Sequence, residues 1–163
     1  MLLQRIVYTN DEGNVSVVVP SPQYKGTIDD LAKKVIPDGV EHYIVEVGDI
    51  PSDRTFRNAW EHNAGAITTN MEKARNIKRE QLRVERAELF VPLDRDFNIA
   101  LEQKDTVKQD EIAAKRQKLR DVTVHPLIEA AKTPQALKNL KIDVTTLDLV
   151  DTSVERKRIG RQR

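Results

Sequence analysis

From Asn70 to Leu101 the chain reads NMEKARNIKREQLRVERAELFVPLDRDFNIAL. In this stretch the apolar residues recur at the three- and four-residue spacing of an α-helix. Asn70 has the side chain of an N-cap, and we predict a helix from it to about Leu89 because Pro92 should break the helix and begin another. The apolar stripe of the first helix is thin among Lys, Arg and Glu. It consists of Ala74, Ile77, Val84 and Val91. So narrow a stripe is typical of a coiled-coil seam that another helix completes.

Helical spacing continues beyond this stretch. Asp105 should begin a further helix that ends near Asp121, and Thr133 should cap a last short one. Short connections between helices favour antiparallel neighbours, so we predict an antiparallel helical hairpin or bundle over residues 70–140. Residues 141–163 alternate only weakly and then become basic, so we predict an extended basic C-terminal tail there.

A small α/β module, residues 1–66, should precede the helices. Two β-branched runs, 5–9 and 15–19, flank a turn rich in Asn and Gly, a pattern that predicts a β-hairpin. Thr27 then caps a short helix, and residues 42–47 alternate like a half-buried strand. The order β-β-α-β predicts one helix on a three-stranded sheet. For the whole chain the predicted fold class is α+β.

The composition excludes several classes of protein. The 163 residues carry a net charge of +1, so any attraction to nucleic acid or membrane would have to be local. Without Cys there is no disulfide framework and no thiolate chemistry. No apolar run approaches the roughly 18 residues that a transmembrane helix requires, and no signal-peptide pattern is present. We therefore expect a protein without a membrane span that is made in the cytoplasm.

The sequence contains no recognisable catalytic pattern. His42, His62 and His125 lie far apart and have no partner at metal-ligand spacing, so we interpret them as surface histidines. Every glycine is isolated, so there is no phosphate-binding loop. Most carboxylates have Lys or Arg within four residues, which is typical of solvated helix faces. We therefore expect no enzyme, no metal site and no cofactor.

The segment DRTFRNAW, residues 53–60, is the strongest candidate for a recognition surface. It contains the only Trp, and an exposed Trp beside Arg is typical of interface hot spots. Phe56, Arg57 and Trp60 are therefore predicted partner contacts, with Ile77 and Val84 on the helix. The alternative interpretation is that Phe56 and Trp60 seal the small module against the first long helix.

The predicted tail concentrates positive charge in Arg156, Lys157, Arg158 and Arg161. These side chains suit an acidic or phosphate-bearing partner, and nucleic acid is one such partner. No aromatic residue is interleaved to stack on bases. A solvated terminus, or an arm on an acidic neighbouring protein, remains the alternative.

Two motifs carry a resemblance to a known group of proteins. DIPSDRTFRNAW, residues 49–60, and AKRQKLRD, residues 114–121, resemble small virion-associated and tail-associated proteins of tailed bacteriophages, including tail and tail-fibre assembly proteins. The resemblance covers most of residues 5–140 and leaves the region from Lys141 onward outside it. It implies a setting in the phage particle and carries over no catalytic residue.

The resemblance and the thin apolar stripe together predict a bacteriophage virion structural protein of the tail or neck. Such a protein would act by protein–protein assembly, as a homo-oligomer in contact with other phage structural proteins. One alternative is a tail assembly chaperone, which would leave before the particle matures. Another is a nucleic-acid-binding accessory protein that uses the basic tail.

Overall fold

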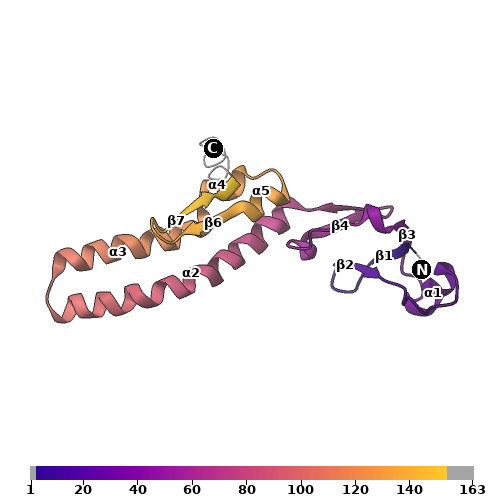
Figure 1. Ribbon diagram of the computed structural model, residues 1–163, viewed down its shortest axis with the longest axis horizontal. Helices are drawn as coiled ribbons and strands as arrows, with labels where there is room; N and C mark the ends of the chain where they lie inside the picture. The colour runs from indigo at the N-terminus through magenta and orange to yellow at the C-terminus, as the bar shows by residue number, and fades with distance from the viewer. Residues whose placement is uncertain (1–2, 154–163) are drawn as a thin grey trace, which may run out of the picture. The chain divides into compact units, whose positions relative to one another are not determined.

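The computed structural model describes residues 3–153, and the chain divides into two compact units, Met1–Ala74 and Arg75–Arg163. Helices and strands both contribute to the structure, which confirms the α+β class. Each unit has a core of its own and is described by itself below (Figure 1).

A three-stranded antiparallel sheet forms the centre of the first unit. Its strands β1 (Gln4–Thr9), β2 (Val15–Val18) and β3 (His42–Glu46) lie in the order β2-β1-β3. In the turn between β1 and β2, the Asn10 side chain accepts hydrogen bonds from two backbone N–H groups of the turn. Gly13 there has φ of +75°, which glycine adopts without strain. Local turn chemistry thus fixes this register.

Helix α1 (Ile28–Val35) covers one face of the sheet. Thr27 and Asp30 form a reciprocal capping box at its start, and two acidic residues lie in its first turn. Its buried face brings Ile28 and Ala32 against Ile6 of β1. Even-numbered residues of β1 therefore face the helix, as the alternation of a strand requires.

A second hairpin, which the sequence analysis did not predict, covers the opposite face. It consists of β4 (Trp60–Asn63) and β5 (Ala66–Thr69), paired antiparallel. Trp60 packs there with Val7 and Val15, which project from the sheet on the side away from α1. The first unit thus has three layers: helix, sheet and hairpin.

A helical hairpin forms most of the second unit. Helices α2 (Met71–Glu102) and α3 (Thr106–Asp121) run antiparallel side by side (Figure 1). The predicted break at Pro92 is wrong, because α2 continues through it. Pro92 lies on the solvent side of α2, where water can satisfy the carbonyl that loses its partner N–H group.

The chain then returns along the first half of α2 through α4 (Pro126–Ala130), α5 (Pro134–Asn139), β6 (Leu140–Asp143) and β7 (Asp148–Asp151). Strands β6 and β7 form an antiparallel hairpin with buried apolar side chains. The prediction of an extended tail from residue 141 is therefore wrong for residues 141–151. Apolar residues at alternate positions allow this segment to pair and to bury one face.

Basic side chains of α2 donate hydrogen bonds to the backbone of this returning segment. Arg75 donates to the carbonyls of Ile128 and Ala131 at the end of α4, at 3.2 and 3.1 Å. Lys78 donates to the carbonyl of Leu140, the residue that caps α5, at 2.5 Å. Carbonyls at a helix C-terminus lack intrahelical partners and carry partial negative charge, so cations stabilise them.

The same arrangement recurs further along α2. Arg86 donates to the carbonyls of Leu119 and Arg120 in the last turn of α3, at 3.0 and 2.8 Å. In the opposite direction, Arg116 of α3 forms an ion pair with Asp94 of α2. Helix α2 therefore satisfies the C-terminal carbonyls of α3, α4 and α5 with three of its own basic residues.

Candidate interaction surfaces

One surface lies along the free edge of β3. The Val47 N–H donates to the Leu3 carbonyl at 3.0 Å, which identifies these two residues as a hydrogen-bonded pair. Hydrogen-bonded pairs alternate in an antiparallel ladder, so the backbone groups of Ile44 and Glu46 point away from β1. Within residues 3–153 no further strand pairs with β3 on that side. This edge is open to an added strand.

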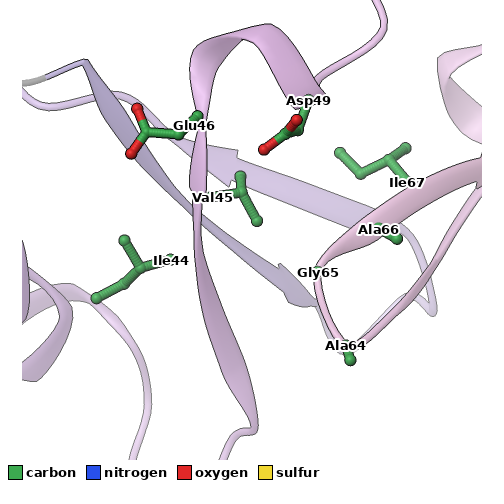
Figure 2. A pocket seen from close by; sticks show the side chains of 8 residues that line it. All are labelled: Ile44, Val45, Glu46, Asp49, Ala64, Gly65, Ala66 and Ile67. Atoms are coloured by element: carbon green, nitrogen blue, oxygen red, sulfur yellow. The ribbon is translucent and has the colours of Figure 1, made fainter.

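A groove of about 510 Å³ follows this edge. Ile44, Val45 and Glu46 of β3 form one side, and the turn and strand of residues 64–67 form the other (Figure 2). A side chain at position 65 would meet a Val45 methyl at 2.8 Å, and φ of Gly65 is +87°. Only glycine allows the turn to lie this close to β3.

The groove carries negative charge. Glu46 and Asp49 lie toward the same end of it, and no basic residue is among its lining residues (Figure 2). The Glu46 carboxylate accepts a hydrogen bond from the Gln4 side chain at 3.1 Å, which holds it in place. An apolar floor with two carboxylates at one end suits an extended peptide that carries positive side chains.

A second surface is the outer face of α2, opposite the side that packs in the second unit. Val84 and Val91 are seven residues apart and are 74% and 68% exposed. Ala87, which is also exposed, lies between them on the same face. Single exposed apolar residues are ordinary, but β-branched residues at heptad spacing are what a helix partner requires.

The predicted recognition segment has a different role from the one first expected. Phe56 and Trp60 are 3% and 2% exposed and belong to the core of the first unit. A partner cannot reach them without opening the module, so the prediction that they are exposed surface contacts is wrong. Trp60 packs against Val7 and Val15 of the sheet. The alternative, a seal against the first long helix, stays a prediction. Arg57 between them is exposed. On α2, Ile77 is half-buried and Val84 is exposed.

The basic residues predicted to meet an acidic or phosphate-bearing partner are Arg156, Lys157, Arg158 and Arg161. They lie outside the described residues 3–153. Their predicted role therefore remains a prediction from the sequence.

The histidines lie in separate surroundings. His62 shares a hydrogen bond with Thr9, Nε2 to Oγ1 at 3.0 Å, and its ring meets Tyr43 edge-on. His125 lies 3.6 Å from an Asp148 carboxylate oxygen. Within residues 3–153 no three His, Asp or Glu side chains converge as a metal site would require. In the same range, no helix is long and apolar enough to cross a membrane.

Lys78 is the buried charged group that sequence reasoning missed. It is 2% exposed, and burial lowers the pKa of its amine from 10.5 to about 8, aided by Lys141 and opposed by Glu85. The signal was present in its spacing, because Lys78 lies four residues from both Ala74 and Leu82 on the inner face. Its contact with the Leu140 carbonyl indicates a structural role.

The groove was also missed, although its second wall has a recognisable signature. Asn63-Ala64-Gly65 followed by the β-branched run of residues 67–69 is a hairpin pattern.

No family model, curated protein or solved structure matches this chain.

Proposed function

We propose that this chain is an assembly protein that binds other polypeptides through the outer face of α2. The observation that carries the proposal is the contrast between the two faces of this helix. Leu82 and Ala100 on the inner face are fully buried, whereas Val84 and Val91 on the outer face are largely exposed. The second unit therefore completes its own core and still presents a heptad-spaced apolar stripe.

The simplest partner for this apolar stripe is the same stripe on a second copy of the chain. A two-fold dimer needs one self-complementary surface, and β-branched residues at heptad positions favour two-stranded packing. Glu80, Glu88 and Arg95 flank the stripe and supply charges of both signs for such a seam. Contacts of this kind suit a structural component present in several copies.

For the biological setting we propose a bacteriophage virion structural protein of the tail or neck. Support comes from the resemblance of residues 49–60 and 114–121 to phage tail-associated proteins. In the second of these motifs, Arg116 and Leu119 have definite roles in the helical hairpin, one in an ion pair and the other in the core. In this proposal the β-β-α-β portion of residues 1–66 acts as a separate binding module.

The oligomeric state tests the proposal. Sedimentation equilibrium of the purified chain should give a mass above that of the monomer, and Val84→Glu with Val91→Glu should reduce it to the monomer. Val144→Glu is the matched control, because Val144 is 70% exposed on the turn between β6 and β7. A monomeric wild-type chain, or an equal effect of the control, would contradict self-association through α2.

Proteomics tests the setting separately. We expect the chain in purified phage particles. Its presence in infected lysate but absence from mature particles would favour the assembly chaperone instead. Salt-sensitive retention on DNA that is lost on deletion of residues 155–163 would favour the nucleic-acid-binding alternative.

A further inference from the structure

We propose that the groove along the free edge of β3 binds an extended segment of a partner protein as an added antiparallel strand, in which two basic residues come directly before two apolar ones. The residues that form this site, among them Ile44, Glu46, Asp49 and Gly65, all belong to the first unit. The proposal assigns a class of ligand, its direction and the order of its side chains. It concerns a different surface from the outer face of α2 and does not rest on the proposed function.

The backbone of β3 supplies the first argument. Ile44 and Glu46 direct their N–H and C=O groups away from β1, and no strand within residues 3–153 takes them up. Lys and Pro usually blunt such an edge, and β3, with the sequence HYIVE, contains neither. The opposite edge of the sheet differs, because β2 is short and Pro20 follows it closely. Outward backbone groups beside a groove are the arrangement that strand addition uses.

The shape of the groove supplies the second argument. Figure 2 shows Ile44 and Glu46 on one side of β3 and Val45 on the other, toward the turn that contains Gly65 and Ala66. Because side chains of a strand alternate between its two faces, a ligand residue opposite Val45 would enter the space of about 510 Å³ between β3 and this turn. An apolar side chain suits that space, and a β-branched one suits the position beside Ile44.

Charge supplies the third argument. The carboxylates of Glu46, at the end of β3, and of Asp49, just beyond it, lie at the same end of the groove, and no basic residue lines it. In an antiparallel strand the residues at this end precede the residue opposite Ile44. The basic residues must therefore come before the apolar ones in the partner's sequence. The same carboxylates would repel an acidic segment or a phosphate backbone, so they also exclude wrong partners.

The synthetic peptide RKLVTT tests the order of side chains. In the proposed register its Lys lies opposite Glu46, its Leu opposite Val45 and its Val opposite Ile44, with its Arg near Asp49. Fluorescence anisotropy of the labelled peptide should show saturable binding to the full chain, and an absence of such binding would overturn the proposal. RLKVTT has the same composition but places Lys in the apolar space, so it should bind at least tenfold more weakly. Equal affinities would overturn the proposed order.

The reversed peptide TTVLKR tests the direction of the added strand. An antiparallel strand with this sequence would place its basic residues beside His42 and away from Glu46 and Asp49. Its affinity should therefore be at least tenfold lower than that of RKLVTT. Equal affinity would mean that the groove does not select an antiparallel strand, and the proposed direction would be wrong.

N-methylation of the peptide separates strand addition from binding through side chains alone. The N–H of the peptide Val would donate to the Ile44 carbonyl, whereas the N–H of the peptide Leu would point away from β3. A methyl group on the Val nitrogen should therefore weaken binding at least tenfold, because it removes a donor and leaves a carbonyl without its partner. A methyl group on the Leu nitrogen is the matched control and should have a much smaller effect. Equal losses would contradict an added strand.

Hydrogen exchange identifies the edge without any change to the chain. With saturating RKLVTT, the amides of Ile44 and Glu46 should exchange at least tenfold more slowly than in the free chain. The amide of Val45 is the internal control, because the register directs it toward Arg5 of β1. Unchanged exchange at Ile44 would place the peptide elsewhere and overturn the proposal.

Charge variants test the acidic end of the groove. Glu46→Gln with Asp49→Asn should weaken the binding of RKLVTT at least tenfold, and salt should weaken it for the wild-type groove. Asp11→Asn with Asp38→Asn removes the same charge from exposed positions of the same unit and should change the affinity far less. Trp60 emission shows whether each variant keeps its core. An equal loss in both variants would mean that the unit attracts any cation, and the assigned site would be wrong.

The variant Val84→Glu with Val91→Glu separates this proposal from the proposed function. It should bind RKLVTT as the wild-type chain does, so each proposal can fail while the other holds. It should also sediment as the same monomer with and without the peptide. A larger species that the peptide dissociates would identify a second copy as the occupant of the groove and would overturn the assignment to a partner protein.

Discussion

In the first unit a sheet presents apolar residues to both of its faces, whereas in the second a single helix presents charged residues to the interior. Ile6 and Val7 are adjacent in β1 and both fully buried, one under α1 and the other under the β4–β5 hairpin. The inner face of α2 instead carries Arg75, Lys78 and Arg86 among its apolar residues. A chain with few aromatic residues thus builds two kinds of core.

The difference has consequences for stability. Apolar burial depends little on pH or salt, whereas hydrogen bonds from cations to helix C-terminal carbonyls depend on the protonation state of the donor. The unfolding of each unit can also be followed by a separate spectroscopic signal. Trp60 fluorescence follows the first unit, and helical circular dichroism follows mainly α2 and α3.

The largest effect should follow from Leu82→Ala, which removes a fully buried side chain of α2. We expect the free energy of unfolding of the second unit to fall by about 3 kcal/mol, from lost apolar burial and the cavity left behind. In urea the helical signal should move to lower denaturant while Trp60 fluorescence stays in place. Val107→Ala, at a position of α3 that is 69% exposed and lies outside the proposed interface, should change neither by more than about 0.5 kcal/mol. Coincident shifts of both signals would show that the units do not unfold separately.

The next effect concerns the pH dependence of the second unit. Burial holds the pKa of Lys78 near 8 in the folded chain against 10.5 in the unfolded one, so between these values the unfolded chain binds more protons. The free energy of unfolding should therefore rise from pH 8 to pH 10.5, by no more than about 3 kcal/mol.

Lys78→Met should remove this slope in urea titrations followed by circular dichroism, whatever it does to stability at neutral pH. Lys115→Met, at an exposed position of α3, should leave the slope intact. A wild-type slope of zero, or one that Lys78→Met leaves unchanged, would refute the assignment.

A smaller effect should appear in the first unit with Gly65→Ala. The new methyl group would clash with Val45 and would require a backbone conformation that disfavours L-residues, at a cost of about 2 kcal/mol. Trp60 fluorescence should report the loss while the helical signal does not change. Gly48→Ala is the control, because nothing lies within 4 Å of the added carbon. Equal stability of the two variants would mean that the β4–β5 turn moves freely away from β3.

Local hydrogen bonds made the helix starts predictable. Thr27, Asn70, Asp105 and Thr133 each accept a bond from a backbone N–H three residues ahead, as their side chains and positions indicated. All the atoms involved are within one turn of the chain, so the signal is complete in the sequence. For the helix that Asp105 caps, the predicted end near Asp121 also agrees with α3, which ends at Asp121.

The tertiary structure alone decided which faces are buried and which elements persist. Val84 was predicted on the seam of α2, yet Leu82 and Lys78 occupy its interior because the segments that return along α2 contact that side. Helix α2 also continues through Pro92. Pro92 has no N–H group to donate within the helix, but it is exposed, so water can bind the carbonyl that lacks this partner. The burial of the inner face of α2 depends on residues that are far away in the sequence, such as Leu140, which is 62 positions from Lys78. A local pattern contains the period of a helix but not the identity of the neighbour that covers it.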